Sequence, residues 1–390
     1  MMRSPLIVFR KEILDNLRDR RTLWSALVFG PLFGPVLFAM LINIQLDRAL
    51  SKIDEPLELP VSGAEFAPNL IQFLQESNTT ILPAPPSAED AVKARLHDVV
   101  LVIPDSYAER FRDGEPAVVR LVADRSNNEA QRQLARARGL LARYSNKIGA
   151  MRLQVRGVSP LVSHPIVVED IDVSTPQGRS VLVLGIMTYF VLFAMLSGGM
   201  PMAIDTTAGE RERGSLEPLL ALPARRPQIL AGKLAATCLF MTLSLMITLA
   251  AFAISLNFVQ LEKLGMSANF GPDVAVKVFL IAWPFVLLGG GLMTFVATFT
   301  KSYKEAQTYL TAVLLVPTIP IIFASIYEVQ AKLELMAIPS LSQHLLITEL
   351  LKGNELNPAW VAVSVGSTLL FGLVLAFLAA KRYESEKILG

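Results

Sequence analysis

The hydrophobic residues of this chain gather into six long segments separated by polar stretches. A transmembrane helix rises about 1.5 Å per residue and needs roughly 20 apolar residues to cross about 30 Å of hydrocarbon. The segments that reach this length without any Asp, Glu, Lys or Arg are Leu23–Ile44, Val181–Ile204, Leu234–Asn257, Val278–Thr300, Ala306–Tyr327 and Pro358–Ala380. The pattern therefore predicts an α-helical polytopic membrane protein with six transmembrane helices.

The charged leader before the first span carries a periodic pattern of its own. Apolar residues recur in it at three- and four-residue spacing, at Leu6, Phe9, Ile13, Leu14 and Leu17. This spacing is typical of an amphipathic helix in a membrane interface, so we expect residues 1–22 to form a cytoplasmic elbow helix. A merely solvated leader is the alternative. The first span, residues 23–46, exceeds the apolar core of a cleaved signal peptide, and we expect it to remain as an anchor.

Between residues 47 and 179 the unbroken apolar runs give way to short alternating segments. Segments typical of strands are Leu57–Val61, Thr80–Leu82, Val99–Ile103, Val118–Val122 and Ile166–Val168. Segments typical of helices are Ala64–Glu76, Ala88–Leu96 after a capping Ser87, Ser106–Arg112 and Asn128–Val155. This order predicts an α/β domain of about 130 residues, which is large enough to bury its own core. Basic side chains on the last helix suit a solvated face, with a functional basic surface as the alternative.

The distribution of Lys and Arg beside the spans predicts their orientation, because cytoplasmic loops carry the excess. One face has six in the leader, five after the second span, two between the fourth and fifth spans and three in the tail. The short loops of the other face contain only Lys263, Lys277, Lys332 and Lys352. We therefore expect both termini in the cytoplasm and the 47–179 domain outside it. Spans two to six then occupy residues 180–380, followed by a cytoplasmic tail at 381–390.

Composition agrees with a bilayer as the solvent. Hydrophobic residues make up 52% of the 390 residues, and the mean hydropathy is +0.47. The formal net charge is only +2, which gives no reason to expect a nucleic-acid partner. The single cysteine, Cys238, excludes an intrachain disulfide and suits a small packing residue. We expect a multi-pass protein of the cell (inner) membrane, with membrane lipid around its spans.

The most specific stretch of sequence follows the second span, at residues 205–233. It contains a charged turn, an amphipathic helix predicted at Ser215–Leu222, a proline stop and a basic entry into the third span. We expect Ser215 to cap this helix and Glu217 to lie in its positive first turn. The helix would expose Leu216, Leu219 and Leu220 for docking into a groove on a soluble partner. A loop held only by lipid head groups is the alternative.

This stretch resembles the cytoplasmic loop of type-2 ABC exporter permeases, the family similar to the sodium-efflux permease NatB. The residues that carry the resemblance are Glu210, Arg213, Gly214, Leu216, Glu217, Leu219, Leu220 and Pro223. Further agreement lies at Asp98–Asp105, Asp113–Gly114, Asp124–Asn128, Pro339, Leu345–Leu346 and Leu350–Gly353. The resemblance implies that these loop residues form a coupling segment to an ABC ATP-binding subunit. It also implies a dimer with a second permease copy or a paralogue.

Other motifs are missing from the sequence. Gly232-Lys233 is followed by Leu234 and has no earlier glycine at the spacing of a P-loop, so we expect ATP and Mg²⁺ on the partner subunit and no cofactor in this chain. The histidines His97, His164 and His344 are scattered, which predicts no metal site. No nucleophile motif occurs either. We therefore expect a transport subunit that is not an enzyme and has no catalytic residue.

The absence of charges from the spans favours an energy source outside the bilayer, because ion-coupled transporters usually keep ionisable groups inside it. Two alternatives stay open: an ion-coupled secondary transporter, and a mechanical subunit that regulates an envelope enzyme. The resemblance suggests Na⁺ as the transported substrate, and a drug, lipid or peptide stays open as the alternative. Candidate sites of helix kinks or close packing are Pro284, Gly289, Gly290, Gly291, Pro317 and Pro320, with a Gly30/Gly34 pair in the first span.

Overall fold

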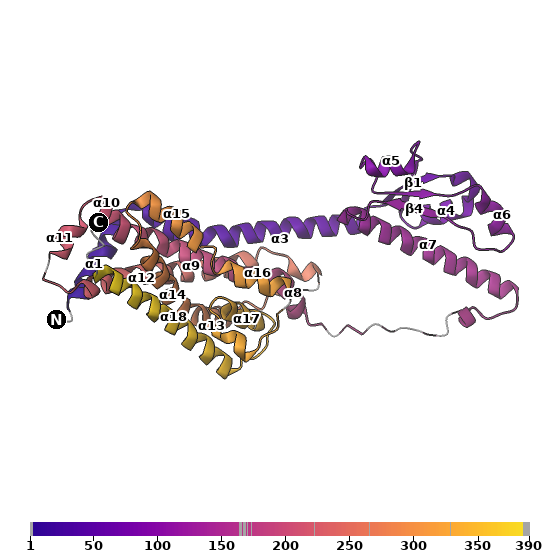
Figure 1. Cartoon of the computed structure of the whole chain (residues 1–390). Helices are drawn as coiled ribbons and strands as arrows, with labels where there is room; N and C mark the ends of the chain where they lie inside the picture. The colour runs from indigo at the N-terminus through magenta and orange to yellow at the C-terminus, as the bar shows by residue number, and fades with distance from the viewer. Residues whose placement is uncertain are drawn as a thin grey trace. The chain divides into compact units, whose positions relative to one another are not determined.

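The computed structural model describes residues 3–163, 166, 169, 171–172, 174–221, 223–264, 266–327 and 329–384. The chain forms two compact units, one of Met1–Asp47 with Val173–Gly390 and one of Arg48–Asp172. Figure 1 shows their elements. The first unit is helical throughout its described part. The second combines helices with a sheet.

The helical unit begins with α1 (Arg3–Arg18), α2 (Arg20–Leu23), the π-helix η1 (Trp24–Phe29) and α3 (Gly30–Asp54), which runs past the end of this unit's first segment. Its second segment contains α8 (Pro176–Leu184), α9 (Met187–Ile204), η4 (Asp205–Gly209), α10 (Glu210–Glu212), α11 (Leu216–Leu220), α12 (Arg226–Leu256) and η5 (Leu261–Leu264). The remaining elements are α13 (Pro272–Ala282), α14 (Pro284–Ala297), α15 (Tyr303–Val313), α16 (Thr318–Ile326), η6 (Leu333–Ala337), α17 (Leu341–Leu351) and α18 (Pro358–Glu384).

In the described part of the chain, five helices are long and apolar enough to cross a membrane, and a bent pair brings the number to six if it is one span. The five are Trp24–Ile44, Met187–Glu212, Arg226–Leu256, Tyr303–Ile326 and Pro358–Glu384. The chain is therefore a mostly helical polytopic membrane protein. Its helices differ from the predicted spans mainly in where they break.

Three predicted spans are interrupted. The second span is divided into α8 and α9 by a turn at Gly185–Ile186. Glycine favours such a break because it is a weak helix former. The fourth is the pair α13 and α14, bent by 40° at Trp283, directly before Pro284. Proline cannot donate the backbone hydrogen bond that would continue the helix. In the fifth, Pro317 precedes the first residue of α16 and Pro320 lies in its first turn, where proline is tolerated.

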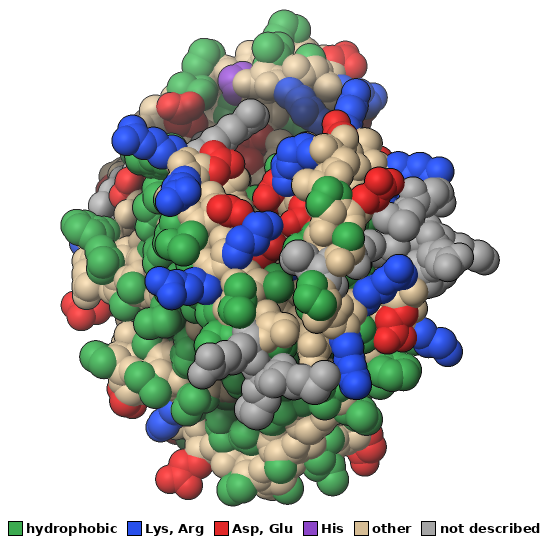
Figure 2. Space-filling view, turned by 90° about the vertical axis from the view of Figure 1, so that its left-hand side faces the viewer, with side chains coloured by type: hydrophobic (Ala, Val, Ile, Leu, Met, Phe, Trp, Pro, Cys, Tyr) green, Lys and Arg blue, Asp and Glu red, His purple; other side chains and the backbone are tan. Residues whose placement is uncertain are grey.

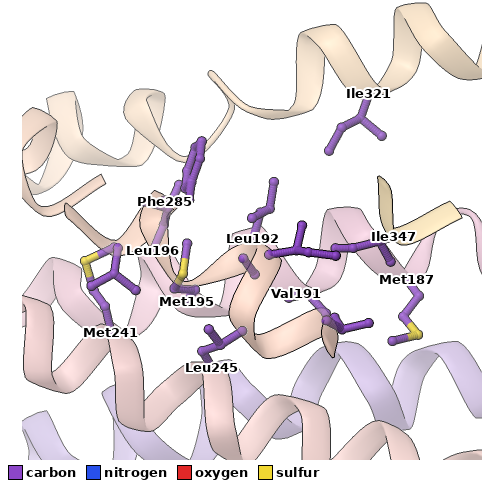
Figure 3. Packing of buried hydrophobic residues seen from close by; sticks show 14 of the residues in the cluster. Met187, Val191, Leu192, Met195, Leu196, Met241, Leu245, Phe285, Ile321 and Ile347 are labelled. Atoms are coloured by element: carbon purple, nitrogen blue, oxygen red, sulfur yellow. The ribbon is translucent and has the colours of Figure 1, made fainter. Parts of the chain in front are cut away.

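The core of the helical unit surrounds α9, whose buried residues include Val191, Leu192, Met195 and Leu196. Figure 3 shows these side chains against residues of neighbouring helices, such as Met241 of α12 and Phe285 of α14. The helices carry apolar residues on several sides, as expected of segments that contact both protein and lipid.

Glycines of α14 allow close helix contacts within this core. A Cβ atom at Gly289 would lie 2.4 Å from Leu196 Cδ2 of α9, and one at Gly290 would lie 3.0 Å from Cys238 Sγ of α12. At Gly291 it would lie 3.1 Å from the backbone oxygen of Gly372 in α18. Three consecutive glycines thus face three different helices, and any larger side chain would push one of them away.

The second unit is built on a four-stranded sheet with the order β2-β1-β3-β4. Its strands are β1 (Leu57–Ser62), β2 (Thr79–Pro83), β3 (Val99–Val102) and β4 (Arg120–Ala123). β1 runs parallel to β2 and β3, whereas β4 is antiparallel to β3. The helical elements are η2 (Ala64–Phe66), α4 (Pro68–Glu76), α5 (Ala88–Lys93), α6 (Ser106–Arg112), α7 (Asn128–Val155) and η3 (Pro160–Ser163).

The long helix α7 covers the sheet with one stripe of its surface. Leu134, Ala137, Leu140 and Tyr144 recur at three- and four-residue spacing and share a buried cluster with residues of β1 and β3. α6 and α7 begin and end at the predicted residues, and Ser87 accepts a hydrogen bond from Asp90 N (3.2 Å) at the start of α5.

Two predicted elements of this unit differ from the structure in more than their end residues. The predicted helix Ala64–Glu76 is split into η2 and α4 at Ala67, because Pro68 opens a new helix. Ile166 of the predicted strand Ile166–Val168 is not in a strand, and the other two residues of that strand, like His164, lie outside the described residues.

Candidate functional site

The segment between α9 and α12 begins as a continuation of α9. The chain passes through the π-helical turn η4 into α10, then turns at Gly214, whose φ of +68° suits glycine. The short helix α11 follows, and α12 begins at Arg226. This short segment therefore connects the transmembrane helices α9 and α12.

Glu210 lies at the centre of a buried charge cluster. Its side chain accepts hydrogen bonds from Lys233 of α12 and from Lys11 of α1, the latter at 3.2 Å. Lys233 Nζ also donates to the backbone oxygen of Thr206 (2.6 Å), and Lys11 Nζ donates to Glu12 Oε1 (3.1 Å). Glu210 is 4% exposed and Lys233 is fully buried. The cluster thus ties α1, α10 and α12 together.

The cluster contains two lysines and two glutamates, and Lys11 Nζ also lies 3.6 Å from Asp15 Oδ2. Burial raises the pKa of Glu12, and the nearby lysines only partly offset this. Burial also acts to lower the pKa of Lys11, but the carboxylates of Glu12 and Glu210 outweigh it, and the net pKa of Lys11 is above its usual value. Lys11 is therefore charged at neutral pH and anchors α1 to Glu210.

The other charged residues of the turn also have partners within the chain. Arg211 donates to the backbone oxygens of Thr300 (2.7 Å) and Thr298 (3.3 Å), beyond the C-terminal end of α14, and Glu212 accepts from the backbone N–H of Tyr303 at the start of α15 (2.5 Å). Both positions suit the charge of the helix end that they contact. Arg213 bonds to Asp205 Oδ1 (2.8 Å) and braces η4. Together with the contacts of Glu210 described above, these contacts hold the turn to α1, α12, α14 and α15.

The helix α11 corrects two predictions. Leu216 was expected to be exposed, but it is 3% exposed and packs with Val8, Ile229 and Tyr383. An apolar side chain gains more by filling this junction of helices than by facing water. Ser215 does not cap α11 through its side chain; its hydroxyl donates to the backbone oxygen of Glu210 (3.3 Å) instead.

The outer edge of the segment is the part of α11 and its flanking residues that faces away from the other helices of the unit. Leu219 is partly buried beside Leu216, and only the backbone of Leu220 is described. The predicted end of the helix, Leu222, lies outside the described residues. Exposed residues along this edge are Arg213, Glu217, Pro218, Ala221, Pro223 and Arg225, and Glu212 and Ser215 are exposed as well. Figure 2 shows this end of the molecule, where basic and acidic side chains are interspersed.

The sequence reasoning missed Lys11 and Glu12 as parts of the site, and it placed Lys233 at the end of the segment without a partner. Lys233 lies just before the predicted third span, but α12 begins seven residues earlier and places it inside the helix. The only sign of Lys233 in the sequence was that a single lysine follows Gly232 directly before the predicted third span. At Gly232 a Cβ atom would lie 2.7 Å from the backbone oxygen of Pro5, so this glycine lets α1 cross α12 closely.

Comparisons with known proteins give two findings. The sequence model of the ABC-2 family transporter proteins matches residues 20–381. The chain is also similar to the ABC transporter permease protein NatB of Bacillus subtilis (strain 168), with 27% identity over 379 residues and 96% of each chain covered.

Proposed function

The chain belongs to the ABC-2 family of transporter proteins, as an ABC transporter membrane subunit, and we propose that it exports its substrate with energy from a separate ATP-binding subunit. The observation that carries this proposal is the construction of the segment at residues 205–233. Its inner side is fixed to α1, α12, α14 and α15, while its outer edge is open to a partner.

Such a segment suits the transmission of force. A partner that moves the edge around Glu217 and Ala221 would move α9 and α12 with it, because the buried Glu210–Lys233 pair links the two helices. Breaking that link would leave a buried charge without its main partner, so the link resists loosening. The residues proposed to contact the ATP-binding subunit are Arg213, Gly214, Glu217, Leu220 and Pro223, with Glu210, Leu216 and Leu219 in supporting positions.

The remaining parts of the proposal concern placement and assembly. The basic residues beside the spans support cytoplasmic termini, a cytoplasmic coupling segment, and the unit Arg48–Asp172 outside the cell (inner) membrane. A second permease copy or paralogue would supply the other half of the transporter. ATP and Mg²⁺ would bind to the partner subunit. Na⁺, drugs, lipids and peptides are all candidate substrates at this point.

Assembly with an ATP-binding subunit tests the proposal. The double variant Glu217→Lys with Ala221→Asp changes two exposed residues at the outer edge of the segment. The matched control is Glu355→Lys with Ala359→Asp, two exposed residues at the same spacing in the loop and start of α18. We expect the purified wild-type chain and the control to carry a P-loop protein with ATPase activity, and the double variant to lose it. A wild-type chain that never assembles with an ATPase would refute the proposal.

A further inference from the structure

An open cavity of about 780 Å³ lies at the surface of the helical unit, between the α8–α9 turn, α16 and α17, and Ile186, Ile322 and Ile326 are exposed along its open side. Figure 1 shows these elements away from α10 and α11, at the other end of the transmembrane helices. Its volume falls in the range of about 300–1,000 Å³ that is typical of pockets for small organic ligands. None of the residues that line it takes part in the charge cluster around Glu210.

The wall of the cavity is mainly apolar. Ile186, Ile321, Ile322, Ile326, Val329 and Leu345 contribute most of the large side chains. Among the described residues that line it there is no Asp or Glu, and the one charged residue, Lys352, already donates to Glu349 Oε1 at 2.6 Å. A cationic ligand would therefore enter without an acidic partner from these residues, which is costly in an apolar site.

A few polar groups interrupt the apolar wall, and three of them have unused hydrogen-bonding capacity. Thr318, His344 and Thr348 each carry a buried polar atom without a hydrogen-bond partner: Thr318 Oγ1, His344 Nδ1 and Thr348 Oγ1. Buried polar atoms are rarely left unpaired in folded proteins. Small side-chain rotations would offer these groups to a ligand in the cavity.

The imidazole of His344 is a neutral group in this site. The residue is 6% exposed, and burial lowers its pKa to about 4. At neutral pH the ring therefore offers one donor and one acceptor but no charge. The lining thus combines neutral hydrogen-bonding groups with a large apolar surface.

We propose that this cavity binds the transported substrate, and that the substrate is a neutral, largely apolar organic molecule with at least one hydrogen-bonding group. This inference rests on the proposed export function, and it selects one class among the substrates left open by the sequence. Na⁺ does not belong to this class, because the described lining residues offer it no carboxylate.

The helix α9 connects the cavity to the charge cluster. Tyr189 lines the cavity near the start of α9, and η4 and α10 continue the helix to Glu210. The 18 residues of α9 span about 27 Å at 1.5 Å per residue. A movement of the coupling segment along or about this helix would change the cavity wall at Ile186 and Tyr189. Occupancy of the cavity and motion of the segment are therefore mechanically linked.

Equilibrium binding to the purified full-length chain in detergent tests the proposal without ATP or a partner subunit. The probe is N-phenyl-1-naphthylamine, a neutral apolar amine whose fluorescence rises in an apolar site. We expect saturable binding that Na⁺ does not compete for. Ala324→Trp, which fills the cavity from α16, should weaken binding at least tenfold, and so should Ser325→Trp at a more exposed part of the wall.

The matched control is Ala312→Trp, an exposed position of α15 outside the cavity, which should bind the probe as the wild type does. Size-exclusion profiles and melting temperatures identify any variant that fails to fold. Non-saturable binding, or unchanged binding in both correctly folded cavity variants, would overturn the proposal. Since no ATPase takes part, a failure here is distinct from a failure to assemble with an ATP-binding subunit.

Discussion

Replacing Lys233 by methionine is the sharpest test of the buried charge cluster. The change keeps the length and apolar stem of the side chain but removes the ammonium that Glu210 and the backbone oxygen of Thr206 share. Removing one partner of a buried ion pair typically costs about 3–5 kcal/mol. In the variant, Glu210 would still pair with Lys11 at 3.2 Å, although the side chain of Lys11 is 47% exposed. We therefore expect the free energy of unfolding to fall by about 3 kcal/mol, the lower end of this range.

Equilibrium unfolding of the purified chain in mixed detergent and SDS measures this loss, and a double-mutant cycle with Glu210→Gln isolates the pair. The double variant leaves no unpaired buried charge at these two positions, so it should be more stable than Lys233→Met alone, with a coupling of about 2 kcal/mol. The control Lys352→Met breaks a partly exposed pair and should cost under about 1 kcal/mol. The reasoning is refuted if Lys233→Met costs no more than this control, or if the two single changes simply add.

Three further changes test other parts of the structure. Leu216→Asp should destabilise the chain by about 2–4 kcal/mol in the same unfolding assay, because it buries a carboxylate among apolar side chains; a loss below 0.5 kcal/mol, typical of surface sites, would contradict the buried position. Gly289→Ala should lower the free energy of unfolding by about 1–3 kcal/mol through overpacking, whereas Gly366→Ala, which has open space in α18, should be neutral or stabilising. The folded chain holds a proton on Glu12 more tightly than the unfolded chain does, so the contribution of Glu12 to stability should fall as the pH rises above 4.5; Glu12→Gln should remove this part of the pH profile, and an unchanged pH profile would count against the burial of this carboxyl.

Hydropathy was sufficient to find the apolar helices, because length and the absence of charge are local properties of the sequence. Their breaks were harder to predict. Pro284 was a candidate kink and lies next to the 40° bend, but the turn at Gly185 was overlooked inside a continuous apolar run. The bounds of α6 and α7 were predictable from the local sequence, because tertiary packing did not override it and Asp105 and Asn127 cap these helices in the structure.

The candidate site was only partly predictable for a physical reason. The motif located the segment, but it could not show that Glu210 pairs with Lys233 and Lys11, residues 23 and 199 positions away. Nor could it show that Leu216 turns inward, because an amphipathic helix looks the same whether its apolar face meets a partner subunit or its own protein. Long-range pairing depends on how α1 crosses α12, and no local pattern encodes that crossing.

The most direct test of the central claim is whether nucleotide moves the coupling segment through a separate subunit. A spin label at Ala221→Cys, in a Cys238→Ala background, reports the distance between the segments of two permease copies in the assembled complex. We predict that ATP shifts this distance distribution only when the ATP-binding subunit is present, and that Lys233→Met weakens the shift. A distribution that ATP leaves unchanged in the complete complex, or shifts equally without that subunit, would contradict the account.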